Sequence, residues 1–319
     1  MRQLTVHKND ENQRLDKYLK KYLKEAPGSF IYKMLRKKNI ILNGKKADGT
    51  EKLIAGDEIK LFFAEETFEK FTGEASSKTS VRFPYKELDI LFEDENLLII
   101  NKPVGELSQK AEPTDVSMNE YALGYLQKTG AVTEESLKVF KPSVCNRLDR
   151  NTSGILIVAK TYQAAREFGE ALQKRTVRKF YQCIVKGTVT NEETIDGYLW
   201  KDEKINKVTI HSKPREGAAE IHTAYHPIKQ LQGLTLLEVH LITGRTHQIR
   251  AHLSSIAHPI LGDLKYGDKK LAEKYHVKHQ LLHASRLELD GFSGEFEKYN
   301  GKIITANTPN IFRKILKED

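Results

Sequence analysis

Two short segments of this 319-residue chain gather side chains that could do chemistry. The first, "NRLDRNTSGILIVAK", places Arg147, Asp149 and Arg150 just before a continuous apolar run. A carboxylate beside a buried strand loses hydration, and a partner has to compensate for that loss. An ionised carboxylate held there could act as a nucleophile, a base or an electrostatic stabiliser. The alternative is a carboxylate that only shapes the turn.

The second segment, "LITGRTHQIRAHL", supplies Arg245, His247, Gln248, Arg250 and His252 within eight residues. Its two arginines are permanently charged, so they need anions as partners. An acidic side chain and nucleic-acid phosphates are the obvious candidates, and a carboxylate paired with a guanidinium stays ionised. We therefore expect an arginine of this segment to meet Asp149. No third ligand accompanies the two histidines, so we expect hydrogen-bonded imidazoles and no metal.

The elements that must position these groups are mostly strands. The patterns predict a hairpin around Asp94–Asn96, a buried strand at 155–160, a helix at 162–174, a strand at 177–187, a pair of strands around Gln232–Gly233, a short helix at 246–256 and a returning strand at 279–289. Many strands with few helices, and no regular βαβ alternation, indicate an α+β domain with a mostly antiparallel sheet.

A smaller unit precedes this domain. The patterns predict an amphipathic helix over Leu15–Leu23, a second helix capped by Ser29, and a hairpin at Asn43–Gly44. Residues 65–80 are polar and weakly periodic, which is typical of a linker. We expect a first domain at 1–64, a linker at 65–84 and a catalytic domain at 85–319.

Composition points to a polyanionic partner. The formal net charge is +9 and the isoelectric point is near 9.2, an excess that favours nucleic acid. The two cysteines, Cys145 and Cys183, have no metal-ligand spacing. No apolar run approaches the ~18 residues of a membrane span, and the N-terminus has no apolar signal segment. We expect a cytoplasmic protein that needs no membrane or metal and is a monomer.

The first unit resembles the S4-type RNA-binding domain. The matching features are "RLDKYL", Ser29, "RKKNIILNGKK" and "AGDEI". The resemblance implies contacts to RNA phosphates from a set of basic side chains: Arg14, Lys33, Arg36, Lys37 and Lys38. Such contacts give affinity and salt dependence but little sequence information.

The second unit resembles the RluA-type family of RNA pseudouridine synthases. "RLDRNTSG", "TGRTHQIRAHL", "HPILGDLKYG" and "LLHASRL" carry the resemblance, together with "EDENLLIINKPVG" and "RKFYQCIVKG". It covers about residues 85 to 295. With the S4-like unit in front, the layout is similar to the branch that modifies large-subunit ribosomal RNA.

This second resemblance implies a role for each matching residue. Asp149 would be the catalytic aspartate and Arg250 its ion-pair partner, in preference to Arg245. Arg147 would enter the space left by the flipped nucleotide. Tyr181 would cover the uracil ring and help to remove the C5 proton. The others, Arg245, His247 and Gln248, would support the site or bind the RNA backbone.

The chain departs from the family pattern twice. Asn146 stands where histidine is common, so the hydrogen bonding of the loop can differ. The segment 104–117, "VGELSQKAEPTDVS", replaces a more apolar run and puts contacts at the edge of the substrate in doubt.

The implied reaction is the isomerisation of specific uridines to pseudouridine, in 23S ribosomal RNA first and transfer RNA second. It would need base flipping but no cofactor, and Asp149 could act on C1′ or on the C2′ proton. Two other functions were weighed. A pure binding protein has no use for an ion-paired aspartate, and a methyltransferase would need a glycine-rich nucleotide loop, which is absent from the sequence.

Overall fold

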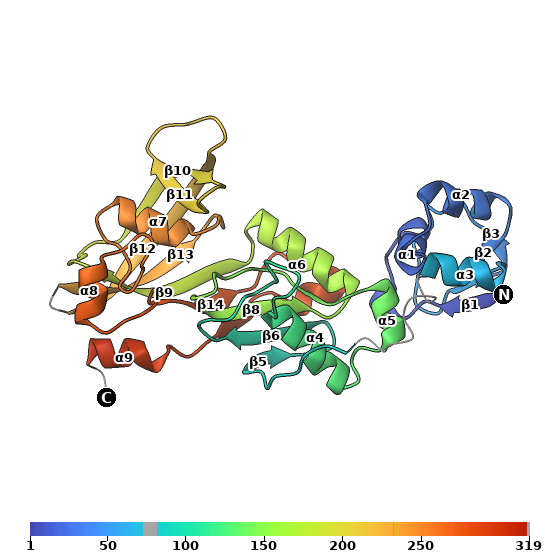
Figure 1. Ribbon diagram of the computed structural model, residues 1–319, viewed down its shortest axis with the longest axis horizontal. Coiled ribbons are helices and arrows are strands. Elements are labelled where there is room, and N and C mark those ends of the chain that lie inside the picture. Colours follow the sequence, from blue (N-terminus) through green and yellow to red (C-terminus); the bar gives the residue numbers. More distant parts are fainter. Residues whose placement is uncertain (73–81, 232, 318–319) are drawn as a thin grey trace.

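The computed structural model describes residues 1–72, 82–231 and 233–317. A small N-terminal unit lies at one end of an elongated body (Figure 1). Its elements are β1 (Arg2–Thr5), η1 (Lys8–Asp10), α1 (Leu15–Tyr22), α2 (Gly28–Arg36), β2 (Ile40–Leu42), β3 (Lys45–Lys46) and β4 (Glu58–Leu61). The strands form an antiparallel sheet in the order β1-β4-β2-β3.

Local signals explain most of this unit. The apolar face of α1 is buried, as its spacing predicts. Asn43 and Gly44 have φ angles of 49° and 74°, so they form the expected two-residue hairpin turn between β2 and β3. The prediction for Ser29 is wrong: α2 begins at Gly28, directly after Pro27, and Ser29 lies inside its first turn. Pro27 stands at the N-cap position, with φ −63° and ψ 146°, and no side chain caps the helix there.

The predicted linker is wrong over its first half. Residues Glu65–Thr72 form helix α3. Phe68 is fully buried in the core of the N-terminal unit. Its ring centroid lies 5.2 Å from that of Phe63, and the ring centroid of Phe71 lies 4.5 Å from that of Phe30. Aromatic burial fixes this helix even though its sequence pattern is weak. Of the remaining linker, 73–81 lies outside the described residues.

The body is built on one large sheet. Its strands are β5 (Ile90–Glu93), β6 (Leu97–Lys102), β7 (Ser143–Val144), β8 (Ser153–Ala159), β9 (Arg178–Lys186), β10 (Glu193–Asp202), β11 (Lys207–His211), β12 (Ala219–Leu231), β13 (Leu234–Leu241), β14 (Leu282–Glu288) and β15 (Ile303–Thr305). The main order is β11-β10-β12-β13-β9-β14-β8-β6-β5, with β7 on β8 and β15 on β14. Among the described strand pairs only β8 and β14 run parallel, which confirms the mostly antiparallel α+β fold.

Helices cover the sheet on both sides. They are α4 (Met118–Lys128), α5 (Glu134–Val139), α6 (Tyr162–Lys174), α7 (Gln248–Ser255), α8 (Lys269–Lys274), η3 (Gly294–Tyr299) and α9 (Asn310–Leu316). Alternate residues of β8 pack against α6 on one face and α4 on the other, which explains its continuous apolar sequence. Helix α7 packs on the β9–β13 part of the sheet.

The parallel junction of β8 and β14 fixes where Asp149 lies. Gly154 has a φ of +112°, and a Cβ there would lie 2.2 Å from the carbonyl oxygen of Ala284 on β14. Only glycine allows the two backbones to approach this closely. The loop that carries Asp149 therefore leads into β8 beside β14. The next strand of the sheet is β9, and residues of β9 pack against α7.

The N-terminal unit packs against the body through α5 and α6. Val139 of α5 is part of the N-terminal core, and the Asn12 amide donates to Gln163 Oε1 at 3.2 Å. The Lys21 ammonium lies 4.2 Å from the centre of the Tyr162 ring. The unit is thus held near the end of the sheet that carries β5, β6 and β8 (Figure 1).

Candidate active site

Asp149 and Arg250, 101 residues apart in sequence, meet in the body. Arg250 Nη1 donates to Asp149 Oδ2 at 2.8 Å. The ion pair expected from the sequence is therefore present, and it uses Arg250 instead of Arg245. Arg250 lies in the first turn of α7, so the packing of that helix on the sheet sets the direction of the guanidinium.

A second carboxylate, Asp263, holds the far side of the same guanidinium. Arg250 Nε and Nη2 donate to its two oxygens at 2.7 and 3.0 Å, and Asp263 is only 1% exposed. Burial alone would raise the pKa of Asp263, but the hydrogen bonds and charge of Arg250 hold it below its usual value. Burial works against the charge of Arg250 too, yet Asp263 and Asp149 raise its pKa. The guanidinium of Arg250 thus lies between two carboxylates, Asp263 on its buried side and Asp149 at the cleft.

Sequence reasoning missed Asp263. Its segment "HPILGDLKYG" was noted, but no spacing rule links it to α7. The Asp263 side chain also accepts the backbone N–H groups of Lys265 and Tyr266 at 2.9 and 3.0 Å. One buried carboxylate thus fixes both the arginine and the loop that follows it.

The Asp149 loop is fixed by three side chains. The buried Lys102 ammonium donates to the carbonyls of Pro103, Glu106 and Arg150, and burial lowers its pKa to about 8. Ser108 Oγ binds both the N–H and the carbonyl of Leu148, each at 2.9 Å. These hydrogen bonds fix the backbone on both sides of Asp149, at Leu148 and at Arg150.

Asn146 is the third of these side chains. Its amide nitrogen donates to the carbonyl of Ile155 and its oxygen accepts the N–H of Ile157, both on β8. An amide can satisfy a donor and an acceptor of one strand at the same time. Asparagine in place of the usual histidine therefore ties the loop to the sheet and leaves Asp149 in position.

For Arg245, His247 and Gln248 the sequence left open whether they support the site or bind RNA. Gln248 is bound by protein groups. It is 2% exposed, and its amide nitrogen donates to the carbonyl of His222 and to Thr223 Oγ1, both at 3.0 Å. Its oxygen accepts from Thr243 Oγ1 and from the N–H of Arg245. These bonds shape the 243–247 turn, and the amide has no group left for RNA.

His247 lies near the same oxygen of Asp149 that Arg250 binds. Its Nε2 lies 3.9 Å from Asp149 Oδ2, and its Nδ1 is 2.9 Å from the hydroxyl of Tyr266. Burial, assisted by the charges of Arg250 and Lys265, lowers the pKa of His247 against the pull of Asp149. The Tyr266 hydroxyl accepts the N–H of Val208 and is free to donate its proton to Nδ1. The neutral imidazole then carries its proton on Nε2, facing Asp149.

Tyr181 comes from β9 and is 6% exposed. Burial and the nearby charge of Asp149 raise the pKa of its hydroxyl, so the ring stays neutral. Strand alternation turns it to the same side as Asp149, while its neighbour Phe180 faces a different cavity on the other side of the sheet. Tyr181 thus offers an aromatic surface at the floor of the site.

Asp149, Arg250, His247 and Tyr181 line one cleft of about 1130 Å³. Its lining includes nine cations, against only two carboxylates, Asp149 and Glu203, among the described residues: Lys110, Arg147, Arg150, Arg175, Lys179, Lys201, Arg245, Arg250 and Lys265. Arg147, Arg150 and Arg245 are exposed. Residues 107–111, from the segment that departs from the family pattern, also line the cleft.

The cations of the N-terminal unit lie apart from the cleft. Lys33, Arg36, Lys37 and Lys38 are exposed on α2 and the turn after it. Arg14 forms two hydrogen bonds of 3.1 Å with Asp16, which also accepts from the Tyr32 hydroxyl at 2.7 Å. Arg14 is thus held in place, whereas the α2 cations have no carboxylate partner within the described part of the chain.

Two features that the sequence argues against are also absent from the described residues. No group of three or more His, Cys, Asp or Glu side chains is arranged to hold a metal ion. No helix in the same residues is long and apolar enough to cross a membrane.

Fold and site together define a class: an α+β enzyme with an ion-paired aspartate and an aromatic ring on the floor of a basic, nucleic-acid-sized cleft. Residues 96–255 match the family model described as RNA pseudouridylate synthase. The chain belongs to this family, and it is an RNA pseudouridine synthase, an isomerase.

Full-length similarities agree. Ribosomal large subunit pseudouridine synthase C of Vibrio vulnificus (strain CMCP6) is 33% identical over 288 residues, which cover 86% of this chain and 84% of that protein. The protein of the same name from Pasteurella multocida (strain Pm70) is 34% identical, covering 97% and 90%. Among solved structures, Human RNA Pseudouridylate Synthase Domain Containing 4 matches with a TM-score of 0.56 and 25% identity, over 72% of this chain and 91% of that one.

Proposed function

We propose that this enzyme isomerises specific uridines of 23S ribosomal RNA, with Asp149 as the catalytic aspartate. The observation that carries the assignment is the ion pair of Asp149 with the buried Arg250 in a cleft lined by cations. The names of the similar bacterial proteins favour large-subunit ribosomal RNA as substrate. Transfer RNA is the alternative target. A cytoplasmic, monomeric enzyme without cofactor or metal completes the proposal.

The reaction requires the target uridine outside its helix. Flipping a base costs a few kcal/mol, and stacking on Tyr181 would return ~1–3 kcal/mol. The exposed Arg147 lies two residues from Asp149 on the same loop, so its guanidinium can fill the vacated stack. Arg150 and Arg245 are exposed in the same lining and would bind phosphates.

Asp149 would act while the N1–C1′ bond breaks. Cationic character on the sugar is stabilised by a carboxylate, which attacks C1′ or removes the C2′ proton. Arg250 occupies Oδ2, and no described side chain binds Oδ1, so Oδ1 faces the substrate. After the uracil rotates and C5 joins C1′, the proton on C5 passes by way of the Tyr181 hydroxyl to solvent, and N1, freed from the sugar, takes up a proton in its place.

The N-terminal unit would bind RNA outside the cleft. Its four exposed cations at the end of α2, with Arg14 beside them, form a charged face that suits a duplex backbone. We assign residues 1–72 to this RNA-binding domain, since α3 shares its core, and 82–317 to the catalytic domain.

The test is isomerisation itself. Total RNA from cells with and without this protein is mapped for pseudouridine, and the wild type and Asp149→Asn are compared by tritium release from RNA that carries 5-³H-uridine. The wild type should add pseudouridines in 23S RNA, and Asp149→Asn should bind RNA normally but release no tritium. Undiminished release by Asp149→Asn would refute the assignment. Sites confined to transfer RNA would move the substrate to that class.

A further inference from the structure

Two cations of the cleft have no role in the chemistry above. Arg175 follows the C-terminus of α6, and Lys179 is the second residue of β9. Both line the cleft that holds Asp149. We propose that Arg175 and Lys179, here called the α6–β9 cation pair, form a binding site for one phosphodiester of the substrate RNA beside the flipped uridine. This proposal rests on the proposed function.

The α6–β9 cation pair differs from its sequence neighbours in having no carboxylate partner in the part of the chain that the structure describes. Among the described residues no carboxylate lies within ion-pair distance of either, although their neighbours Lys174 and Arg178 are paired with Glu170 and Glu288. The two carboxylates of the cleft are already occupied: Asp149 binds Arg250 and Glu203 binds Lys201. Two like charges held together without an anion are unfavourable in the free protein, and a shared anion removes this cost.

Lys179 is also partly desolvated. Burial lowers the pKa of its ammonium, and the positive charge of Arg175 lowers it further. Its Nζ lies against the turn after β13, because a Cβ added at Gly244 would come within 3.4 Å of it. Gly244 and Lys179 both line the cleft, so the ammonium lies at its wall beside this turn. A phosphate there would meet a cation with little water to displace.

Arg175 is held by an unusual backbone. It has φ 66° and ψ 22°, the left-handed conformation that glycine favours at the end of a helix. Arginine is disfavoured there on conformational grounds, and this cost is consistent with a role for its side chain. The conformation ends α6 and starts the turn into β9, and this turn brings Arg175 to the same cleft as Lys179.

Position identifies the ligand. Lys179 and Tyr181 are two residues apart on one face of β9, a separation of ~7 Å along the strand. If Tyr181 covers the uracil, this distance places Lys179 beside the sugar-phosphate of the same or the next nucleotide. The ligand is therefore a backbone phosphate close to the target, not a distant one.

The experiment uses the full-length chain and a stem-loop fragment of 23S RNA that the wild type isomerises by tritium release. Lys179→Gln and Arg175→Gly remove the two charges, and glycine retains the left-handed backbone. Lys174→Gln removes an exposed neighbouring charge that is paired with Glu170 and lies outside the cleft lining. Binding is measured in the Asp149→Asn background, so that the RNA stays unmodified. Thermal unfolding verifies that each variant is folded.

We expect each of the two variants to weaken RNA binding about tenfold and to reduce the slope of log K against log salt by ~0.7–0.9. With active Asp149, kcat at saturating RNA should stay within about twofold, and Lys174→Gln should match the wild type. A full loss of kcat without a change in binding would overturn the phosphate site and assign the pair to chemistry.

Single neutral methylphosphonates near the target uridine identify the contact. Neutralising one linkage within two nucleotides of the uridine should weaken RNA binding by the Asp149→Asn protein. The same neutral linkage should cause no further loss when Lys179→Gln is added to that protein. Additive losses at every linkage would overturn the proposal while the proposed function stands. If the wild type isomerises no 23S fragment, the proposed function fails and the phosphate site fails with it.

Discussion

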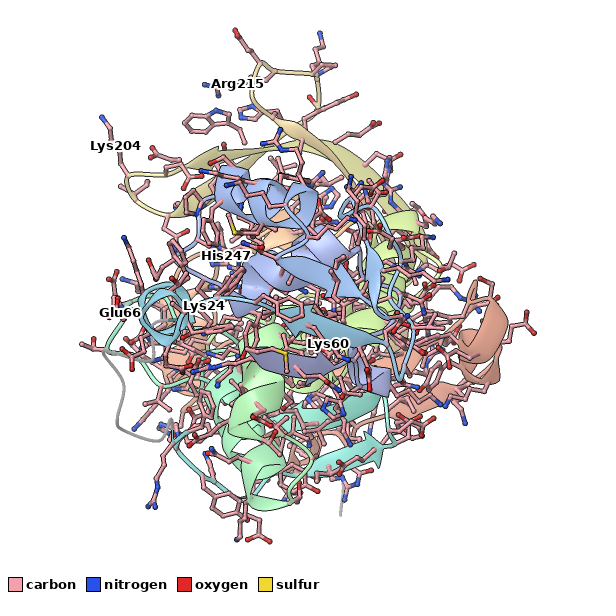
Figure 2. The ribbon with its side chains drawn as sticks, turned by 90° about the vertical axis from the view of Figure 1, so that its right-hand side faces the viewer. Lys24, Lys60, Glu66, Lys204, Arg215 and His247 are labelled. Carbon is pink, nitrogen blue, oxygen red and sulfur yellow. The ribbon has the colours of Figure 1, made fainter. Side chains whose placement is uncertain are left out.

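The catalytic cleft and the N-terminal unit handle charge in opposite ways. In the cleft, Arg250 is 7% exposed and clamped between two carboxylates through three hydrogen bonds of 2.7–3.0 Å. On the N-terminal unit, the α2 cations are exposed and lack carboxylate partners within the described residues, and Figure 2 shows this unit facing the viewer with Lys24, Lys60 and Glu66 on its surface. Buried charges fix a geometry, whereas exposed ones supply attraction that salt can screen.

The β10–β11 hairpin and the loop after it carry further exposed cations. Figure 2 shows Lys204, on the β10–β11 turn, and Arg215, on the loop that follows β11, at the upper rim of the molecule, while His247 lies nearer the middle of the view. Substitutions among the paired charges around Arg250 should therefore act on kcat, and substitutions of cations that lack a carboxylate partner among the described residues should act on RNA affinity.

Asp263→Asn should lower kcat about 100-fold and leave the KM for RNA within about threefold, because Asp263 orients Arg250 and has no contact with the cleft. Loss of one bidentate oxygen frees the guanidinium to turn, and a misplacement of ~1 Å can cost this factor. Tritium release at varied RNA concentration separates kcat from KM. Glu273→Gln, an exposed change of the same kind on α8, is the control. Equal losses in kcat and affinity would contradict a positioning role.

The triple substitution Arg36→Ala, Lys37→Ala, Lys38→Ala should weaken RNA binding about tenfold and reduce the salt slope by about 2, with kcat unchanged. A matched control removes three exposed cations at the other end of the molecule: Arg313, Lys314 and Lys317 on and after α9. The two triples change the net charge equally. If both weaken binding to the same degree, the N-terminal unit gives only general attraction and is no specific RNA clamp.

Tyr266→Phe should lower kcat about fivefold, with RNA affinity unchanged. The substitution removes the hydroxyl that binds His247 Nδ1 and leaves the N–H of Val208 without its acceptor. The effect is smaller than that of Asp263→Asn because His247 is also held by its position before α7. Tyr275→Phe, at the end of α8, serves as the control. A kcat equal to that of the wild type would show that the orientation of His247 does not matter.

Local sequence signals predicted what local physics decides. Asn43–Gly44, the Asp94–Asn96 turn and the apolar run of β8 each encode their element within a few residues. Helix α3 was mistaken for linker because its stability comes from Phe68 and Phe71 packing on distant residues. Helices α4, α5, α8 and α9 were not predicted.

The site shows the same limit. A contact between Asp149 and an arginine of the 245–250 segment could be predicted because a carboxylate near a strand needs a cation, and the family resemblance favoured Arg250 over Arg245. The role of Asp263 could not be predicted, because Arg250 was already assigned to Asp149. Only the three-dimensional fold shows that the same guanidinium binds a second carboxylate. Lys179 was passed over for a related reason: its lack of a partner is visible only once its neighbours are placed.

Asp10 extends the comparison to carboxylates. It is 3% exposed in the N-terminal unit, and burial raises its pKa to about 6, against the weaker opposing charges of His7 and Lys21. Among residues 1–72, 82–231 and 233–317 no arginine compensates for the burial of Asp10, whereas Arg250 compensates for that of Asp263. From about pH 4 to about pH 6 the folded protein binds more protons at Asp10 than the unfolded chain, so the free energy of unfolding falls as pH rises and is level above that range.

Asp10→Asn should remove this cost, because an amide of the same shape needs no ionisation. At pH 8 the variant should be more stable than the wild type by about 1–2 kcal/mol, and at pH 4 the difference should vanish. Urea unfolding at both pH values measures it, and Asp263→Asn serves as the contrast. Its partner Arg250 makes the ionised carboxylate favourable, so that variant should lose stability at pH 8. If both variants shift in the same direction, the partner does not decide the effect of a buried carboxylate in this protein.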